Sequence, residues 1–135
     1  MIHSVDSLHL LAEINRQSEK IGKMMDILIQ VNTAADENKF GIRPEELDGF
    51  LQQATRFPNI SVKGLMTIGR QFADEAGTRR SFQELHKLFV DTKEKKYDNI
   101  NMIFLSMGMS ADYKIAIEEG SNMVRIGTSI FGKRK

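Results

Sequence analysis

Two short motifs near the C-terminus contain the residue types that bind a phosphate group. Ser106–Ser110 reads Ser-Met-Gly-Met-Ser, and Arg125–Thr128 reads Arg-Ile-Gly-Thr. Glycines let backbone N–H groups approach an anion closely, and hydroxyl groups add further hydrogen bonds. Each motif accompanies a short apolar run typical of a β-strand, so both are predicted at strand ends. The pair predicts a phosphate site formed by two consecutive strands.

Arg125 is the charged residue of the second motif, and its neighbours in sequence are apolar. It lies between Val124 and Ile126 in a predicted strand, so alternation sends its side chain to an interior or to a helix-covered face. A charge in such a place is rare unless it is paired. Two interpretations stay open: a buried salt bridge, or a ligand role, which the adjoining Gly127 favours.

Ser110 and the two motif glycines also have structural explanations. Ser110 stands with Asp112 at the predicted start of a short helix, where its hydroxyl could cap the helix, bind an anion, or do both. Gly108 and Gly127 could each serve turn geometry alone. The side chain of Met107 is predicted to pack around the site.

Other residues that could do chemistry are less informative. Lys39 lies in the polar loop 32–41 after a predicted strand, and a solvated lysine is the favoured interpretation. His3, His9 and His86 show no metal-ligand or triad spacing, so they are assigned no chemistry. The absence of cysteine excludes disulfides and thiolate metal sites.

The spacing of apolar residues changes repeatedly along the chain between the period of a strand and that of a helix, and this predicts the elements that position the motifs. Strands are predicted at 2–5, 27–31, 60–68, 102–105 and 123–126, and helices at about 8–21, 44–54, 75–95 and 113–119. This strict alternation predicts a single α/β domain, residues 1–135, with a parallel sheet and right-handed crossovers. Such folds bind ligands at the C-terminal ends of their strands, where both motifs fall.

Composition excludes several classes of partner. The 135 residues include 19 basic and 18 acidic side chains, for a formal net charge of +1, which gives no electrostatic reason to expect nucleic acid or an anionic membrane. The basic cluster 133–135 is interpreted as a solvated tail. No apolar run approaches the roughly 20 residues of a membrane span, so a cytoplasmic location is predicted.

Several strings occur in a consistent order between Ile2 and Gly132. They are HSVDS, QVNTAADENKFGI, VKGLMTIG, FLSMGMSADYKIAIEEGSNMVRIGT and SIFG. Together they resemble the pyridoxal-phosphate homeostasis protein family, whose members are barrels similar to the N-terminal domain of alanine racemase. The stretch from Leu105 to Gly132 is the most specific part of this resemblance.

The resemblance implies a (β/α)₈ barrel that binds pyridoxal 5′-phosphate as a Schiff base on a lysine near the end of the first strand. It implies that Ser106 and Ser110, or the backbone around Met107, help to bind the phosphate. Gly127 and Thr128 would bind the phosphate from the last strand.

The same resemblance implies that Arg125 approaches the pyridine nitrogen of the cofactor. A guanidinium stays protonated, so it disfavours protonation of the ring nitrogen beside it. An unprotonated ring is a poorer electron sink for carbanion chemistry. Asn32 and Met66, at other strand ends, would line the cofactor pocket less directly.

The chain departs from the family pattern in its length. A complete barrel needs about 250 residues, and the five βα elements here match the family's fourth to eighth strands. The family's first three strands would be missing, and with them the lysine that forms the Schiff base. None of Lys39, Lys63 or Lys114 matches the motif of that lysine. The prediction is therefore a partial barrel of five strands and four helices with open edges, which needs self-association or the missing half to cover its apolar interior.

Three functions remain in competition. The leading one is a binding module for intracellular pyridoxal 5′-phosphate homeostasis, which carries the phosphate side of the site and binds the cofactor non-covalently, if at all. No acid–base pair is visible, so no catalytic residue is assigned. The second function is a fragment of a pyridoxal-phosphate-dependent racemase or isomerase, and the third is an inert fragment whose site accepts any oxyanion.

Overall fold

A parallel β-sheet forms the centre of the molecule. The computed structural model describes residues 1–34, 36–37, 40–69 and 74–135. Its strands are β1 (Ile2–Val5), β2 (Met25–Gln30), β3 (Ile60–Met66), β4 (Ile100–Met109) and β5 (Met123–Arg125). Each pairs in parallel with the next, in the order β1-β2-β3-β4-β5. The predicted parallel α/β architecture is confirmed.

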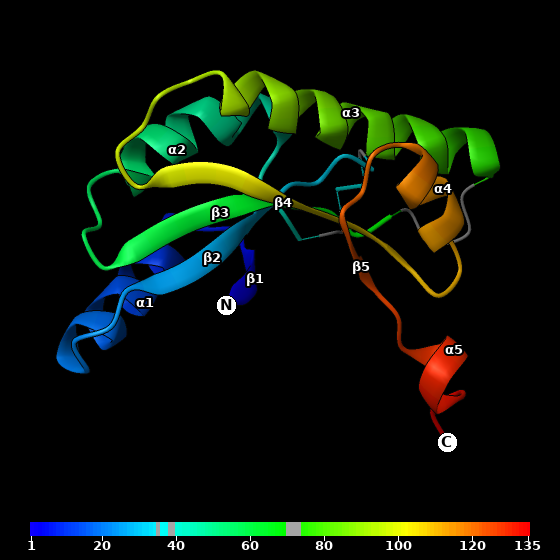
Figure 1. The fold of residues 1–135 in the computed structure, drawn as a ribbon, viewed down its shortest axis with the longest axis horizontal. Coiled ribbons are helices and arrows are strands. Elements are labelled where there is room, and N and C mark those ends of the chain that lie inside the picture. Colours follow the sequence, from blue (N-terminus) through cyan, green and yellow to red (C-terminus); the bar gives the residue numbers. More distant parts are fainter. Residues whose placement is uncertain (35, 38–39, 70–73) are drawn as a thin grey trace.

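Helices connect the strands. They are α1 (Leu8–Lys20), the 3₁₀ helix η1 (Pro44–Glu46) leading into α2 (Leu47–Ala54), α3 (Glu75–Lys93), α4 (Tyr113–Glu118) and α5 (Thr128–Phe131). α1 contacts β2, β3 and α2, whereas α3 and α4 pack against β4 and each other. Figure 1 shows α2, α3 and α4 along one side of the curled sheet, and α5 standing apart near the C-terminus.

Local sequence explains where the longer helices begin and end. Ser7 caps α1 by accepting a hydrogen bond from the Leu10 N–H at 3.1 Å, and Asp74 caps α3 in the same way through the Gly77 N–H at 2.8 Å. Gly22 follows α1 with φ +62°, the left-handed conformation that ends many helices.

The main core lies between the sheet and the helices. Strands contribute Ile27, Ile29, Leu65, Leu105 and Met107, and helices contribute Leu11, Leu51, Phe82 and Leu85. All of them are almost fully buried, and each such side chain stabilises the fold by about 1.5–3 kcal/mol relative to an exposed one. Leu28, between Ile27 and Ile29, points to the opposite face of the sheet, and it is buried as well.

Bulges in the sheet fix a close contact between β3 and β4. β2 pairs Ile27 with Val62 and then Leu28 with Gly64, so β3 contains one extra residue. Such bulges increase the local twist of a strand. A Cβ on Gly64 would lie 1.8 Å from the Phe104 carbonyl oxygen, so only glycine allows the two strands to approach here.

Several element boundaries differ from the prediction, most of them by one or two residues. β4 runs to Met109 instead of ending at Leu105, because Met107 continues the buried face and Met109 pairs with Arg125 on β5. Most of the first motif therefore lies within the strand and not beyond it. β3 ends at Met66, two residues earlier than predicted. The short helix α5 was not predicted.

Candidate functional site

The two C-terminal motifs meet at the end of the sheet. The Ser110 Oγ accepts hydrogen bonds from the backbone N–H groups of Gly127, at 3.2 Å, and Ser129, at 3.1 Å. Both donors sit at the start of α5 and are exposed. Donors that converge on a hydroxyl oxygen are also suited to an anionic oxygen, which accepts stronger hydrogen bonds. The predicted convergence of the motifs is therefore present in the fold.

Ser110 does not cap the short helix that follows it. Asp112 occupies the N-cap position of α4, and its Oδ1 accepts from the Met109 N–H at 2.7 Å. The capping interpretation of Ser110 is wrong, because the chain makes one more turn before the helix begins. The hydroxyl of Ser110 is directed to the second motif instead.

Gly108 has a structural reason to be glycine. Its φ is +100°, and a Cβ there would lie 2.6 Å from the Ala116 Cβ and 3.0 Å from the Tyr113 Cα. A side chain at this position would push α4 away from β4. The structural interpretation of Gly108 is therefore sufficient.

Gly127 has no such reason within the described residues. Its φ is −123°, and apart from Gly127 itself and its two neighbours in sequence, no heavy atom of the described chain lies within 4 Å of where its Cβ would stand. Neither a left-handed conformation nor packing requires glycine there. The open space beside an exposed N–H group suits the close approach of an external group. Thr128, the next residue, is exposed at the first position of α5.

Arg125 is held by two neutral groups. Its Nη1 donates to the Ser106 Oγ at 2.6 Å and its Nη2 to the Thr67 carbonyl oxygen at 2.8 Å. In the described parts of the chain no carboxylate lies within ion-pair distance of it. The buried salt bridge considered for Arg125 is therefore not formed there, and the two bonds use two of the five guanidinium donors.

Burial and one nearby carboxylate act in opposite directions on the pKa of Arg125. Burial lowers the pKa of the Arg125 guanidinium from its ordinary value, and the charge of Asp112 opposes this shift. An arginine with a lowered pKa remains charged at neutral pH. The site therefore presents a half-buried cation near the end of β4 and β5.

Ser106 and Met107 belong to different faces of β4. The Ser106 hydroxyl is fully buried beside Arg125, whereas the Met107 side chain is fully buried in the core under the helices. The Met107 carbonyl oxygen accepts from the Ser121 Oγ at 2.8 Å. Met107 thus packs in the core with its side chain on the face of β4 opposite to Ser106, and its part in cofactor binding stays a prediction.

Two residues near Arg125 were missed by the sequence patterns. Thr67 follows β3 directly, is fully buried and accepts from Arg125 through its carbonyl oxygen. His3 on β1 lies close enough for the Arg125 charge to lower its pKa, together with burial, which is the larger cause. The only available signal for Thr67 was its position at the C-terminal end of a buried strand.

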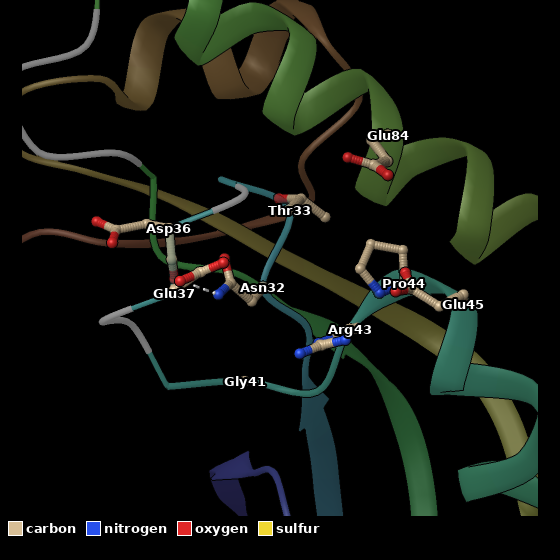
Figure 2. A pocket seen from close by; sticks show the side chains of 9 residues that line it. All are labelled: Asn32, Thr33, Asp36, Glu37, Gly41, Arg43, Pro44, Glu45 and Glu84. Atoms are coloured by element: carbon tan, nitrogen blue, oxygen red, sulfur yellow. Dashed lines mark hydrogen bonds between the residues drawn. The ribbon is translucent and has the colours of Figure 1, made fainter.

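A cavity opens beside the loop after β2. It measures about 620 Å³, and Figure 2 shows its lining side chains: Asn32, Thr33, Asp36, Glu37, Gly41, Arg43, Pro44, Glu45 and Glu84. Burial raises the pKa of Glu84, and the charge of Glu45 adds to the shift. Asn32, predicted to line the cofactor pocket less directly, lies here and donates to the Asp36 carbonyl oxygen at 2.8 Å. Lys39 lies outside the described residues.

Two further features are absent from the described residues. These residues contain no group of three or more histidine, aspartate or glutamate side chains placed to hold a metal ion. Of the described helices, none has the length and apolar character needed to cross a lipid bilayer.

Comparisons with known proteins agree with the resemblance. The model of the alanine racemase N-terminal domain matches residues 1–135. The pyridoxal phosphate homeostasis protein of Aquifex aeolicus is 41% identical over 135 residues, 100% of this chain and 58% of that protein. The structure of PipY from Synechococcus elongatus without PLP is 31% identical, with a TM-score of 0.88 over 97% of this chain and 60% of that one.

A second PipY structure, described as having PLP bound, gives a TM-score of 0.84 at 28% identity, over 97% of this chain and 60% of that one. The present chain thus spans less than two thirds of the length of these relatives. The predicted partial barrel of five parallel strands is confirmed.

Proposed function

The chain belongs to the alanine racemase N-terminal domain family, and from that premise we propose that it is the phosphate-binding part of a pyridoxal 5′-phosphate carrier. The observation that carries the proposal is the meeting of the two motifs, in which Gly127 and Ser129 direct N–H groups to the Ser110 hydroxyl. The names of its relatives, and the PLP bound in one PipY structure, support the choice of cofactor.

The residues of the site fit this cofactor. The Gly127 N–H donates to the Ser110 Oγ in this structure, and it would turn to a phosphate oxygen, which is the stronger acceptor. The hydroxyls of Ser110 and Thr128 would donate to the same phosphate, and the open space at Gly127 allows its close approach. Ser106 supports the site by accepting from Arg125. When bound, the cofactor supplies an aldehyde and a pyridine ring that can accept electrons.

Arg125 would face the pyridine nitrogen, and its charge favours binding over catalysis. Its two hydrogen-bond partners are neutral, so its positive charge is not cancelled by direct pairing. A persistent cation beside the ring nitrogen opposes protonation of that nitrogen and weakens the ring as an electron sink. We infer a carrier and not a racemase; turnover of an amino-acid substrate by this chain would contradict that inference.

Binding by this chain is expected to be weak and non-covalent. Lys63 lies within β3 and Lys114 within the short helix α4, and neither matches the motif of the lysine that holds the cofactor in the family. Without a covalent bond, the phosphate contacts must supply most of the affinity. The partners we propose are the small cofactor and either a second copy of this chain or the remainder of a barrel, in the cytoplasm.

An absorbance titration with pyridoxal 5′-phosphate tests the proposal. We expect saturable binding that Arg125→Ala weakens about tenfold or more and Thr128→Ala weakens severalfold, since hydrogen bonds to charged groups contribute about 1.5–3 kcal/mol. Arg16→Ala, which removes an exposed arginine on α1, is the matched control and should bind like the unmodified chain. Thermal melts of each variant separate loss of binding from loss of folding.

Two outcomes would reject the proposal. Inorganic phosphate that binds as tightly as the cofactor would indicate an inert site that accepts any oxyanion. Borohydride treatment that attaches the cofactor to one specific lysine of this chain would show that binding is covalent, which contradicts the non-covalent mode proposed above.

A further inference from the structure

A chain of buried hydroxyl groups runs from α3 to the strand ends beneath Arg125. The Ser81 Oγ lies 2.7 Å from the Thr33 Oγ1, which lies 3.1 Å from the Thr67 Oγ1. The Thr67 Oγ1 in turn donates to the Val31 carbonyl oxygen at 2.7 Å. All four residues are buried, with exposed fractions of 6% or less.

The direction of these hydrogen bonds follows from the chemistry of the groups. A carbonyl oxygen only accepts, so the single hydroxyl proton of Thr67 goes to Val31. Thr67 must then accept the proton of Thr33, and Thr33 must accept the proton of Ser81. Each hydroxyl therefore has one defined orientation, and α3 is tied to the ends of β2 and β3.

Thr67 connects this chain of hydroxyls to the cation. Its N–H donates to the Ser106 carbonyl oxygen at 3.1 Å, and its own carbonyl oxygen accepts from the Arg125 Nη2 at 2.8 Å. The second donor of Arg125, Nη1, is bound to the Ser106 hydroxyl. Thr67 is thus held by hydrogen bonds at three places: its side chain, its N–H and its carbonyl group.

We propose that Thr67 is a positioning residue that fixes the direction in which Arg125 presents its guanidinium to the ring nitrogen of the cofactor. The inference rests on the function proposed above. An arginine side chain has many rotamers, and ordering it at the moment of binding lowers affinity. Because Thr67 and Ser106 hold two of its nitrogens in advance, that loss occurs during folding instead.

Two ligands that differ only at the ring nitrogen test this role. Pyridoxal 5′-phosphate has the nitrogen, and its 1-deaza analogue has a C–H group in the same place, so the analogue cannot bond to Arg125. We expect the unmodified chain to bind the first about tenfold more tightly than the second. Thr67→Val keeps the branched shape but removes the hydroxyl, and it should reduce this preference to about threefold or less.

The control variant is Thr92→Val, which also removes the hydroxyl of a buried threonine. Thr92 lies near the C-terminal end of α3, away from Ser81 near the N-terminal end. This variant should retain the tenfold preference. General loosening of the fold would weaken both ligands equally and leave their ratio unchanged, so the ratio separates positioning from stability. If Thr67→Val does not fold, Ser81→Ala is the alternative variant. It removes the hydroxyl at the α3 end of the hydrogen-bonded row that leads to Thr67, and it should also reduce the preference.

A readout without any ligand is the exchange of the Arg125 side-chain N–H protons, followed by NMR. We expect exchange to become faster in Thr67→Val and to stay unchanged in Thr92→Val. An unmodified chain that prefers the natural ring, with the same preference in Thr67→Val, would reject the role of Thr67 alone. An unmodified chain with no preference would reject the proposed use of Arg125 as well, and with it the inference.

Discussion

Gly108 and Gly127 occupy similar places in two motifs, yet their surroundings differ. Gly108 has φ +100° and faces Ala116 across a space too small for a methyl group, whereas Gly127 has a negative φ and open space beside it. The first glycine is needed by the fold. For the second we propose that an external group approaches the open space, and substitution at the two positions should separate these roles.

We expect Gly108→Ala to destabilise the protein by about 2–4 kcal/mol, which combines the cost of a left-handed alanine with overpacking against α4. The matched control is Gly49→Ala, since Gly49 is exposed within α2 and has no heavy atom near its missing Cβ. That variant should gain up to about 1 kcal/mol from helix propensity. Urea denaturation measures both, and equal effects would contradict the crowding at Gly108.

Gly127→Ala should change binding more than stability. No described atom crowds the position, so we expect the free energy of unfolding to change by less than about 1 kcal/mol. A methyl group beside the converging N–H groups should nevertheless weaken cofactor binding severalfold. Titration and denaturation of the same sample would decide, and unchanged affinity would count against a phosphate at this place.

The pH dependence of stability should contain a contribution from His3. Burial, and then the positive charges of Arg125 and the N-terminus, lower the pKa of His3 below its ordinary value of 6.5. The unfolded chain therefore takes up this proton at a higher pH than the folded chain, so acidification below about pH 6.5 should destabilise the fold. In thermal melts between pH 7.5 and about 5, His3→Gln should flatten this fall, whereas Ser4→Ala, on the same strand, should not.

At the scale of elements, β5 is attached to β4 by side chains as well as by main chain. Only Ser106↔Met123 and Met109↔Arg125 pair the two strands. Before β5 begins, the Asn122 Oδ1 accepts from the Leu105 N–H at 2.7 Å, and its Nδ2 donates to the Ile103 carbonyl oxygen at 2.8 Å. The asparagine thereby takes the place of a strand residue and extends the sheet.

We expect Asn122→Ala to destabilise the protein by about 1–2 kcal/mol, because it leaves one main-chain donor and one acceptor without their partners. Amide hydrogen exchange at Leu105 should become faster. Asn101→Ala, at an exposed position of the same β4, is the control and should change little. Unaltered exchange at Leu105 would show that the side chain does not hold β5 in place.

The elements themselves could be predicted from sequence because their apolar periods are regular. The five strands and four connecting helices were predicted, but the end of β4 was not, since Met107 and Met109 belong to a motif that reads equally well as a loop. The meeting of Ser110 with Gly127 followed from parallel topology. Thr67 could not be predicted, because a single buried hydroxyl leaves no periodic signal and its partners lie up to 58 residues away.

At the scale of the whole molecule, the described sheet is curled but does not close into a barrel. β1 and β5 occupy the two ends of the order, and no pairing joins them among the described residues. Unpaired strand edges can add strands from another chain. α5 adds an apolar surface near one of these edges, since Ile130 is 68% exposed and Phe131 is 85% exposed.

The unpaired edges of β1 and β5 and the exposed apolar side chains of α5 predict that this chain associates with itself. Sedimentation equilibrium across micromolar concentrations would measure this association. We expect an apparent mass that rises with concentration, because burial of the exposed side chains of α5 and of strand edges is favourable. Phe131→Ser should weaken the association, since it removes apolar surface beside β5. Phe40→Ser, which changes an equally exposed phenylalanine (82%) in the loop after β2, should leave it unchanged if α5 is the contact. A monomer at every concentration, with a cooperative thermal transition, would show that the curled sheet is stable with its edges open.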